Sequence, residues 1–554
     1  EKLWNSRVAA VSIEPRVVAA SFADGKLTYW ASSQGTHDFR DGAAKCLGMD
    51  PSEVRVLVKD IGGGFGAKIT TYLEPVAAVL SKKSGRPVQV VMSRKDVFEG
   101  TGPTSASLMR TKIGATKDGK ITAAQLWMAF EAGAYPGSPV GGGTLCATGP
   151  YNIANLLVDG YDVVCNKQKV QAYRAPGQPQ GAFAVEPVID ELAEKLGIDP
   201  IEFRLMNVSK EGDRMPNGVP HPHFGIKEME EAMRAHPHYK TSLTGPNQGR
   251  GVAVGYRWQG GQASSATITV NNDGTINLVT GSVDIGGSRT AVAQMFAEVL
   301  GLAIEDVIPQ VADTDTIGFT SNTGGSGVAF KTGWAAHEAA QDVKRQLIER
   351  ASLIWDTTVD QIEYVDGAVQ HKSDNELRMT FQEISGQLAS TGGPVVGRAN
   401  LNPSGAVGSY SANIIDIELD PDTGKIDVLR VTAIQDVGTA IHPDYVEGQM
   451  QGGAAQGIGW ALNEEYYMGE DGSMQNTSLL DYRMPTTLDL PMIDPIMVEK
   501  PNPSHPFGVK GVGEANIAPP LGALSNAVHD ATGVRMRNLP MNPASVLKAL
   551  QEKK

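Results

Sequence analysis

Residues 511–520 (GVGEANIAPP) place one carboxylate among small and apolar residues. Glu514 follows a glycine-hinged turn, precedes a predicted helix, and has no Lys or Arg nearer in the sequence than Lys510. Burial without a countercharge would raise the pKa of this carboxyl group towards neutrality. A carboxylate whose pKa lies near the working pH can accept a proton as a general base. Because an acidic residue near a helix N-terminus also stabilises the helix, a purely structural role is the alternative.

A second candidate is Arg174, the one charged residue in the segment 172–177 (AYRAPG). A cation in an otherwise uncharged loop can hold an anionic group of a substrate or stabilise negative charge that develops during a reaction. The structural alternative is an ion pair with a nearby carboxylate such as Glu186. The sequence leaves both interpretations open.

Glycine is the compositional outlier, with 63 of 554 residues, where an ordinary protein has about 7%. Much of it lies in six clusters between structured segments. Glycine permits positive φ and a close approach of the backbone to a ligand. Each cluster alone could be a simple turn, whereas six in one chain favour a shared ligand. The clusters lie at residues 62–66 (GGGFG), 141–143, 286–287, 324–327 (GGSG), 452–453 and 511/513.

The composition limits the partners and the compartment of the chain. It has 48 Lys and Arg against 62 Asp and Glu, a net charge of -14, which argues against nucleic acid and anionic membranes as partners. No apolar run reaches the length of a membrane-spanning helix. Three cysteines are too few for a disulfide framework. They are also too few for an iron–sulfur cluster held by this chain alone, which normally needs four thiolates. The low cysteine count fits a reducing compartment.

The ten histidines give no set with the spacing of metal ligands. His221 and His223, like His236 and His238, lie in a polar, Pro-rich stretch, and we expect both pairs at the surface. No metal held by protein side chains is predicted.

Turn signals separate β-rich runs along the chain, and each predicts a hairpin. Apolar periodicity predicts helices over residues 187–196 and 291–300, each followed by glycine. The unit 47–53 (LGMDPSE) recurs almost unchanged at 196–202 (LGIDPIE), where Gly ends one helix and Asp, Pro and Glu begin the next turn. The hairpin signals are Asp24-Gly25, Asp118-Gly119, Asp273-Gly274 and Asp422-Thr423-Gly424.

These signals predict an α+β fold with two elongated mixed domains of antiparallel sheets and packed helices. The charged, Pro- and His-rich stretch 210–248 is predicted to be a surface connection, which places the boundary between domains 1–245 and 246–554. The polar stretch 351–393 is predicted to be an excursion of the second domain.

Four motifs, in this order, resemble the molybdenum-binding subunit of the xanthine dehydrogenase/aldehyde oxidase family over nearly the whole chain. They are DIGGGFGAK at residues 60–68, AYRAPG at 172–177, QGGAAQG at 451–457 and GVGE at 511–514. Subunits of this family normally have more chain before the point that corresponds to Glu1. The resemblance therefore implies a first molybdopterin-binding domain that is incomplete at its N-terminus, its missing portion lost or supplied by a separate chain.

The resemblance implies a molybdopterin cofactor, in bacteria often its cytosine dinucleotide form. Its molybdenum is held by the pterin dithiolene and not by protein side chains. The implied partners are a subunit with two [2Fe–2S] clusters and a subunit with FAD, in a cytoplasmic hetero-oligomer. The implied reaction is oxidative hydroxylation of a small molecule, in which water supplies the oxygen and two electrons leave through the partner subunits.

By the same resemblance Glu514 is the catalytic base and Arg174 a second catalytic residue. Residues 451–457 are expected to open a helix whose N-terminal amides suit phosphate oxygens. The alternative for this stretch is a close helix–helix contact through small residues. The cofactor-binding residues implied by the motifs are Gly63, Gly64, Phe65, Gly66, Ala175, Gly324, Gly325, Ser326, Gln451, Gly452, Gln456 and Gly513.

The chain departs from some members of the family at the substrate side. The loop 175–177 (APG) lacks the cysteine of the carbon monoxide dehydrogenases, which argues against a copper-bearing site. Ile69 replaces the glutamate of xanthine-oxidising members, and Pro176 replaces an aromatic residue that packs on their substrate. Residues 284–288 (DIGGS) lack the Gln of a GQG turn that contacts the pterin. The predicted substrate is an aldehyde or an N-heteroaromatic compound.

Two other functions are compatible with parts of the sequence. A non-catalytic relative would bind a ligand or act as a scaffold, and the absent Gln and the shortened N-terminus would fit it. A hydrolase with Glu514 as its base would need a nucleophile, and the chain has no GxSxG motif.

Overall fold

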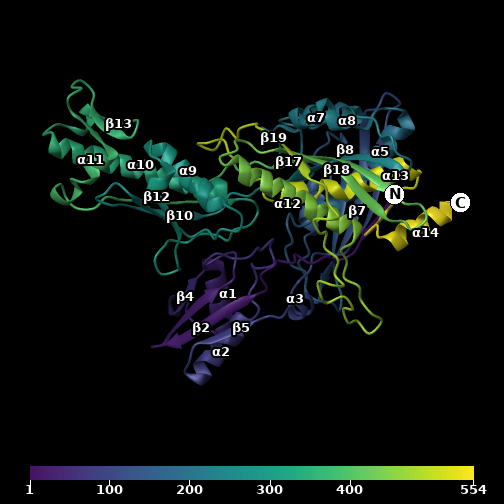
Figure 1. The fold of residues 1–554 in the computed structure, drawn as a ribbon, viewed down its shortest axis with the longest axis horizontal. Coiled ribbons are helices and arrows are strands. Elements are labelled where there is room, and N and C mark those ends of the chain that lie inside the picture. The colour runs from purple at the N-terminus through teal and green to yellow at the C-terminus, as the bar shows by residue number, and fades with distance from the viewer. Residues whose placement is uncertain (554) are drawn as a thin grey trace.

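The computed structural model describes residues 1–553, which form an elongated molecule of three connected lobes (Figure 1). The lobe at the bottom of Figure 1 is a four-stranded sheet of order β4-β3-β2-β5. It consists of β2 (Val17–Ala23), β3 (Lys26–Ala31), β4 (Val54–Leu57) and β5 (Val88–Val91), with α1 (His37–Leu47), η1 (Pro51–Glu53) and α2 (Glu74–Ser84). The helix α3 (Arg94–Gly100) follows it.

The lobe at the left of Figure 1 contains the sheet β12-β11-β10-β16, on which the long helix α10 packs. A small sheet β13-β14-β15 extends from it, so the stretch 351–393 is the excursion that the sequence predicts. The elements are β10 (Ser264–Val270), β11 (Ile276–Thr280), α9 (Ser288–Leu300), η2 (Ile304–Asp306), β12 (Val307–Val311), α10 (Val328–Ile354), η3 (Val359–Gln361), β13 (Ile362–Val365), β14 (Ala368–His371), β15 (Arg378–Thr380), α11 (Phe381–Ser385), η4 (Leu388–Ser390) and β16 (Val396–Leu401).

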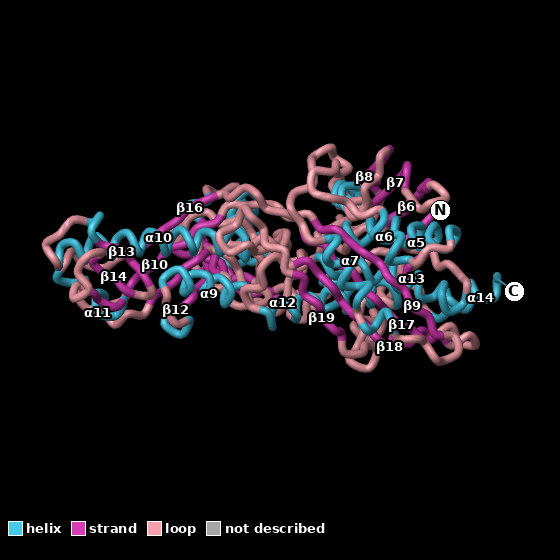
Figure 2. Tube along the Cα trace, turned by 90° about the horizontal axis from the view of Figure 1, so that it is seen from above, coloured by secondary structure: helices cyan, strands magenta, loops and turns pink. Residues whose placement is uncertain are grey.

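The largest lobe holds the sheets β20-β1-β6-β7-β8 and β19-β18-β17-β9, and Figure 2 shows it at the opposite end of the long axis from α11. Its strands are β1 (Lys2–Asn5), β6 (Ser107–Ala115), β7 (Ile121–Gly133), β8 (Asn155–Val164), β9 (Gln248–Arg257), β17 (Ser409–Leu419), β18 (Ile426–Asp436), β19 (Ile493–Val498) and β20 (Asn538–Leu539). Its helices are α4 (Val140–Cys146), α5 (Gln178–Leu196), α6 (Pro200–Met206), α7 (Ile226–Ala235), α8 (Pro237–Lys240), α12 (Pro443–Leu462), η5 (Ala515–Ile517), α13 (Pro519–Thr532) and α14 (Pro543–Lys553).

Helix α13 lies directly on β9 and β17 and also contacts α5 and α12. Two glycines of β9 make this close approach possible. A Cβ at Gly251 would lie 1.8 Å from the carbonyl oxygen of Ala523, and one at Gly249 would lie 2.1 Å from that of Ala527. The segment that carries Glu514 leads into this helix, so the position of the carboxylate depends on the packing of α13.

The main hydrophobic core of the largest lobe draws on both predicted domains. It contains Phe130 and Phe183 from residues 1–245, together with Ile414 and Trp460 from residues 246–554. The strand β1 also pairs in parallel with β20 near the other end of the chain. The boundary near residue 245 stays a prediction, while the two segments on either side of it share one core.

The predicted α+β class and all four predicted hairpins are confirmed. Each sheet of four or five strands also contains a parallel pair, so the sheets are mixed rather than purely antiparallel. The predicted helix at 291–300 lies within α9. Helix α5 begins at Gln178, so Pro187 lies inside it and not at its start. Residues 178–189 of α5 are buried, and tertiary packing offsets the cost of an internal proline.

The stretch 210–248 is more than a surface connection. It carries α7 and α8, and the prediction that its histidines lie at the surface is wrong for His221 and His238, which are 3% and 0% exposed. Nδ1 of His238 lies 2.8 Å from the Thr432 hydroxyl, and its Nε2 lies 3.0 Å from the carboxylate of Asp416. These partners belong to β17 and β18, so strands that are distant in the sequence surround the imidazole ring.

No helix of residues 1–553 is both long enough and apolar enough to cross a membrane.

Candidate active site

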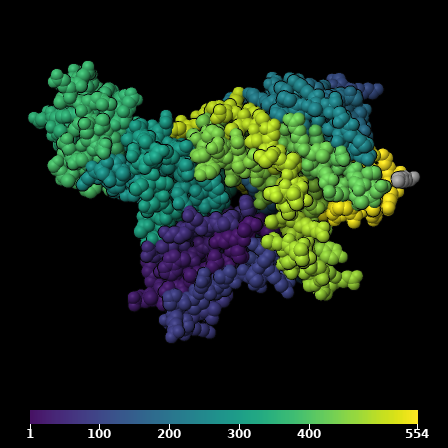
Figure 3. All heavy atoms as spheres, viewed as in Figure 1, coloured from purple at the N-terminus to yellow at the C-terminus, as the bar shows by residue number. Residues whose placement is uncertain are grey.

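A cavity of about 320 Å³ opens where the lobes meet. Its wall is built from the purple, teal and yellow-green parts of the chain, which adjoin near the centre of the face drawn in Figure 3. The contributing segments are the loop with Phe65, Gly66 and Ile69; the loop with Ala172, Arg174 and Pro176; Arg257 and Trp258 at the end of β9; residues 285–288; residues 322–329; the start of α12; and residues 509–514. Four of the six glycine-rich segments of the sequence, all except 141–143 and 452–453, line this wall.

Glu514 is fixed by donors from three other segments. The backbone N–H of Ala175 donates to its Oε1 at 2.9 Å, and the hydroxyl of Ser326 donates to its Oε2 at 2.9 Å. Nη2 of Arg257 lies 3.2 Å from Oε1 and 3.4 Å from Oε2. The carboxylate therefore has one defined orientation at the cavity wall.

The pKa of Glu514 is lowered, whereas the sequence predicted that it would be raised. Burial by itself raises the pKa of the carboxyl group. The charge of Arg257 and the hydrogen bonds from Ala175 and Ser326 outweigh burial and hold the pKa below its ordinary value. The prediction of a raised pKa is wrong because it counted only cations near Glu514 in the sequence. Arg257 reaches it through the tertiary fold.

Arg174 is buried and holds the backbone next to Glu514. Its Nε donates to the carbonyl oxygen of Gly513 at 2.6 Å, its Nη1 to Oε1 of Gln456 at 3.0 Å, and its Nη2 to the carbonyl oxygen of Gln449 at 2.9 Å. Burial lowers the pKa of Arg174 to about 10. The side chain lines the cavity, but the structure gives it no hydrogen bond to the carboxylate of Glu514.

The alternative pairing of Arg174 with Glu186 is wrong. Glu186 is held instead by Arg204, whose Nη2 lies 2.9 Å away, and by the hydroxyl of Tyr151. This buried pair is absent from the cavity wall that Arg174 lines.

The loop 62–66 folds against the loop that carries Arg174. Phe65 and Gly66 have φ angles of 53° and 99°, and the N–H of Arg174 donates to the carbonyl oxygen of Phe65 at 2.9 Å. A Cβ at Gly66 would lie 2.6 Å from the carbonyl oxygen of Ala172, so only glycine fits. Phe65 and Gly66 line the cavity, whereas Gly63 and Gly64 lie behind them and support the turn.

The loop 322–327 brings Gly324, Gly325 and Ser326 to the cavity wall as the motif predicts. Ser326 has a φ angle of 54°, and no atom lies within 4 Å of the position of a Cβ at Gly325. Lys331, in the first turn of α10, holds this loop, and no motif of the sequence pointed to it. Its ammonium donates to the carbonyl oxygens of Ser321 and Asn322 at 3.0 and 2.8 Å, and burial lowers its pKa to about 7.

The expectation that residues 451–457 open a helix is wrong, because α12 begins at Pro443 and these residues lie in its middle. Their backbone amides are therefore not free N-terminal donors. Gly453 and Gly457 instead allow close contact with residues 516–520, as the alternative interpretation proposes.

Of the polar residues in this stretch, only Gln456 bonds to Arg174. Gln451 donates to the carbonyl oxygen of Ile493 in β19, away from the cavity. Gly452 lies behind Arg174. A Cβ at Gly452 would lie 3.6 Å from Nη1 of Arg174.

The cavity suits a bulky ligand that is bound largely through backbone groups. Phe65, Ala175 and Ser326, three non-glycine residues around it, adopt left-handed φ angles, which turns their backbone amides and carbonyls from their usual directions. The open space at Gly325 leaves room at the wall. In residues 1–553, no group of three or more His, Cys, Asp or Glu side chains could hold a metal ion. The lining residues therefore fit a cofactor bound largely through backbone groups.

Comparison with known proteins decides which cofactor this is. A family model described as "Molybdopterin cofactor-binding domain" matches residues 1–208, and a second model with that description matches residues 227–491. The xanthine dehydrogenase molybdenum-binding subunit of Escherichia coli O157:H7 is 31% identical over 547 residues, which cover 94% of this chain and 72% of that protein. The chain belongs to this family of molybdenum-binding subunits. It is a molybdopterin-dependent oxidoreductase of the molybdenum hydroxylase type.

Other members of the family agree with this assignment. The aldehyde oxidoreductase molybdenum-binding subunit PaoC of Escherichia coli K12 is 28% identical, covering 98% of this chain and 74% of that protein. The crystal structure of quinoline 2-oxidoreductase from Pseudomonas putida 86 superposes on the whole chain with a TM-score of 0.91 and 27% identity, and the match covers 76% of that chain. This molybdenum hydroxylase subunit therefore has both the fold and the cofactor class that its four motifs imply.

Proposed function

We propose that this subunit catalyses oxidative hydroxylation of an aldehyde or of an electron-poor carbon in an N-heteroaromatic ring, with Glu514 as the general base. The observation that carries the proposal is the position of this residue. Among the cavity-lining residues of the described chain, Glu514 is the sole carboxylate. Its lowered pKa keeps it ionised, and therefore ready to accept a proton, at neutral pH.

The residues of the wall are proposed to hold the cofactor mainly through their backbone. Phe65, Gly66, Gly324, Gly325 and Ser326 present backbone groups and one hydroxyl to the cavity. When bound, the molybdopterin supplies a metal centre that takes up two electrons and delivers oxygen derived from water to the substrate carbon. The cytosine dinucleotide form is proposed from the family resemblance, and nucleotide analysis of the released pterin tests it.

The substrate is proposed to be small and largely apolar. Ile69 and Pro176 line the cavity, and the exposed face of Trp258 adds an aromatic surface. Because Ile69 offers no carboxylate for the polar edge of a purine, a screen should favour aldehydes or simple N-heteroaromatic compounds over xanthine. Faster turnover of xanthine than of every compound in those two classes would contradict this assignment.

Electrons are proposed to leave through partner subunits that carry [2Fe–2S] clusters and FAD. The relatives named above are themselves described as subunits, which supports a complex. Co-purification with a tagged subunit, followed by iron and flavin analysis, tests this proposal.

The decisive experiment replaces Glu514 by Gln. Loss of the base should lower turnover by about 10²–10⁴-fold, while the molybdenum and pterin contents stay at the parental level. Glu464→Gln is the matched control, since Glu464 is also buried but is absent from the cavity wall. Near-parental turnover by a molybdenum-replete Glu514→Gln enzyme would contradict the assigned role. Parental protein that takes up no molybdenum would instead favour a non-catalytic relative.

A further inference from the structure

We propose that Arg257 is a positioning residue for Glu514, which keeps the carboxylate ionised and oriented and thereby sets the acidic limit of turnover. The inference rests on the proposed role of Glu514 as the base. It assigns a role to a residue outside all four motifs that carry the family resemblance.

Arg257 comes from a rigid part of the fold. It is the last residue of β9, where it pairs in register with Ser409 of β17. Its guanidinium lies 4.6 Å from the ring centroid of Trp258. Stacking on this ring and pairing of the strand limit the positions of the guanidinium, so its Nη2 is held towards both oxygens of Glu514.

The other nitrogen donors of Arg257 have no partner among the described residues, which leaves Glu514 as the group that this side chain binds. Its Nε and Nη1 are buried and have no hydrogen-bond partner in the described chain. Its side chain is 6% exposed. A buried cation requires a compensating charge, and Glu514 is its sole ion-pair partner among residues 1–553. The two side chains therefore stabilise each other's charged forms.

Other charged or titratable groups near Glu514 do not replace Arg257. Arg174, from the loop before α5, donates its hydrogen bonds to Gly513 and to residues of α12. Cys146, from α4, is a neutral thiol because burial raises its pKa to about 11. Lys510, from the same segment as Glu514, is paired with Asp436 at 2.6 Å.

The loop 322–327 contributes only the hydroxyl of Ser326 to the carboxylate. Arg257 is therefore the cation that offsets the burial of Glu514. Removing it should leave burial dominant and raise the pKa of Glu514, because an adjacent opposite charge lowers a carboxyl pKa by about 1–3 units.

The test compares Arg257→Met and Arg257→Lys with the parent holoenzyme. In Arg257→Met, the acidic limb of the kcat/KM profile should move up by about 1–3 pH units. Arg257→Lys keeps the positive charge and should return the limb towards that of the parent. A second readout is the carboxyl C=O infrared band of the resting protein, identified as the band that Glu514→Gln removes. Its titration should shift in the same direction as the acidic limb.

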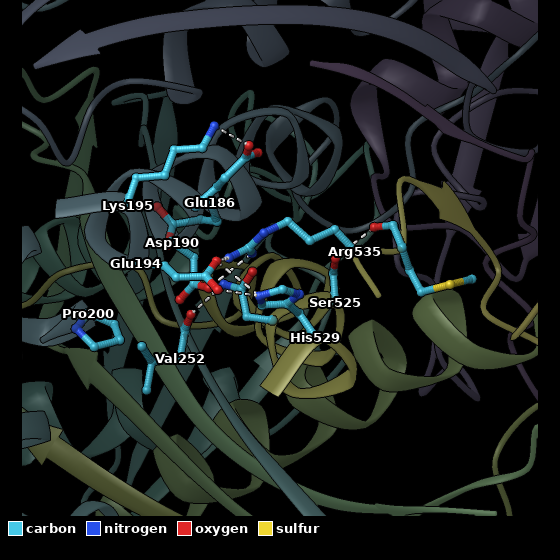
Figure 4. Close-up of polar contacts among 12 residues, drawn as sticks. Glu186, Asp190, Glu194, Lys195, Pro200, Val252, Ser525, His529 and Arg535 are labelled. Atoms are coloured by element: carbon cyan, nitrogen blue, oxygen red, sulfur yellow. Dashed lines mark hydrogen bonds and ion pairs between the residues drawn. The ribbon is translucent and has the colours of Figure 1, made fainter. Parts of the chain in front are cut away.

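Arg535→Met is the matched control. Figure 4 shows Arg535 beside Asp190 and Glu194, and its side chain is 9% exposed. This variant also removes a largely buried arginine from an ion pair, but the pair lies outside the cavity wall. It should leave both titrations unchanged.

Unchanged infrared titration of Glu514 in Arg257→Met would overturn the proposal, as would an equal shift in Arg535→Met. If Arg257→Met does not fold, the same infrared comparison is made with Arg257→Gln, which also removes the positive charge. An unshifted titration of Glu514 in that variant would overturn the proposal. The infrared result does not depend on catalysis, so it separates failure of this proposal from failure of Glu514 as the base, which Glu514→Gln tests through turnover.

Discussion

The Nε of Arg174 donates a 2.6 Å hydrogen bond to the backbone carbonyl oxygen of Gly513, the residue directly before Glu514. The same guanidinium binds Gln456 and Gln449 of α12. The arginine thus joins three segments and fixes the backbone from which the carboxylate extends. Its geometry supports a positioning role towards Glu514, and any contact with substrate stays a prediction.

Gln456→Ala should destabilise this connection. It leaves one N–H of the buried Arg174 without its partner, which costs about 1–3 kcal/mol in the free energy of unfolding. Turnover should also fall, because the backbone at Gly513 loses support. Thermal unfolding and steady-state kinetics measure the two effects. Gln451→Ala, in the same helix but bonded only to Ile493, is the control and should retain parental turnover. Equal losses of turnover in the two variants would contradict the assignment of Gln456 to the site.

Gly66→Ala should reduce cofactor content. The substitution places a Cβ 2.6 Å from the carbonyl oxygen of Ala172 at a φ of 99°, so the loop must move. Gly25→Ala is the control, because Gly25 also has a positive φ, 77°, but has no atom within 4 Å of its Cβ position. The control should lose only about 1–2 kcal/mol in the free energy of unfolding, which is the cost of a left-handed backbone conformation for a residue with a Cβ. Molybdenum analysis of both purified variants distinguishes them, and full occupancy in Gly66→Ala would contradict the prediction.

Lys510→Met should destabilise the segment that leads to Glu514. Nζ of Lys510 lies 2.6 Å from Oδ2 of Asp436, and both side chains are fully buried. Removing one member of a buried pair leaves an uncompensated charge and costs about 3–5 kcal/mol. Lys425→Met removes an exposed pair with Asp427, which water screens, and should cost far less stability. Chemical denaturation compares the free energy of unfolding of the two variants. Similar small losses in both would contradict a large contribution of the buried pair to stability.

The stability of Glu464→Gln should depend less on pH than that of the parent. Burial raises the pKa of Glu464 to about 8, against an opposing hydrogen bond from Tyr482. Between the ordinary pKa of 4.5 and about 8, the unfolded chain has released this proton while the folded protein retains it. Stability therefore falls as pH rises through this window, by up to about 1.4 kcal/mol per unit. Gln has no proton to release. The stability of the variant relative to the parent, measured by thermal unfolding, should therefore rise between pH 5 and pH 8.5. Parallel curves would contradict the raised pKa.

Local features of the fold could be predicted from the sequence because short-range physics decides them. Turn dipeptides such as Asp24-Gly25 fix the conformation of neighbouring strands, and a glycine such as Gly48 ends a helix in the left-handed conformation wherever it lies. Helix α5 shows the limit of this reasoning. Its start at Gln178 depends on burial against other segments. The apolar periodicity of the sequence predicted a start at Pro187, nine residues too late.

The candidate site residues were predicted from motifs that carry the family resemblance. Phe65, Gly324, Ser326 and Glu514 lie in separate segments, and the tertiary fold brings them to one wall. Gln451 was assigned from its motif alone, but the orientation of a residue in mid-helix depends on where the helix begins and on which face it buries.

The sequence by itself determined the α+β class, the turns, and a set of glycine-rich segments with one isolated carboxylate, because backbone conformation and composition are local properties. Only the tertiary structure decided which charge meets that carboxylate. Arg257 and Glu514 are 257 residues apart in the chain, yet the ends of β9 and of the segment before α13 place them 3.2 Å apart. The Coulomb energy of an ion pair depends on distance in space and on the surrounding dielectric, and neither can be read from separation along the chain.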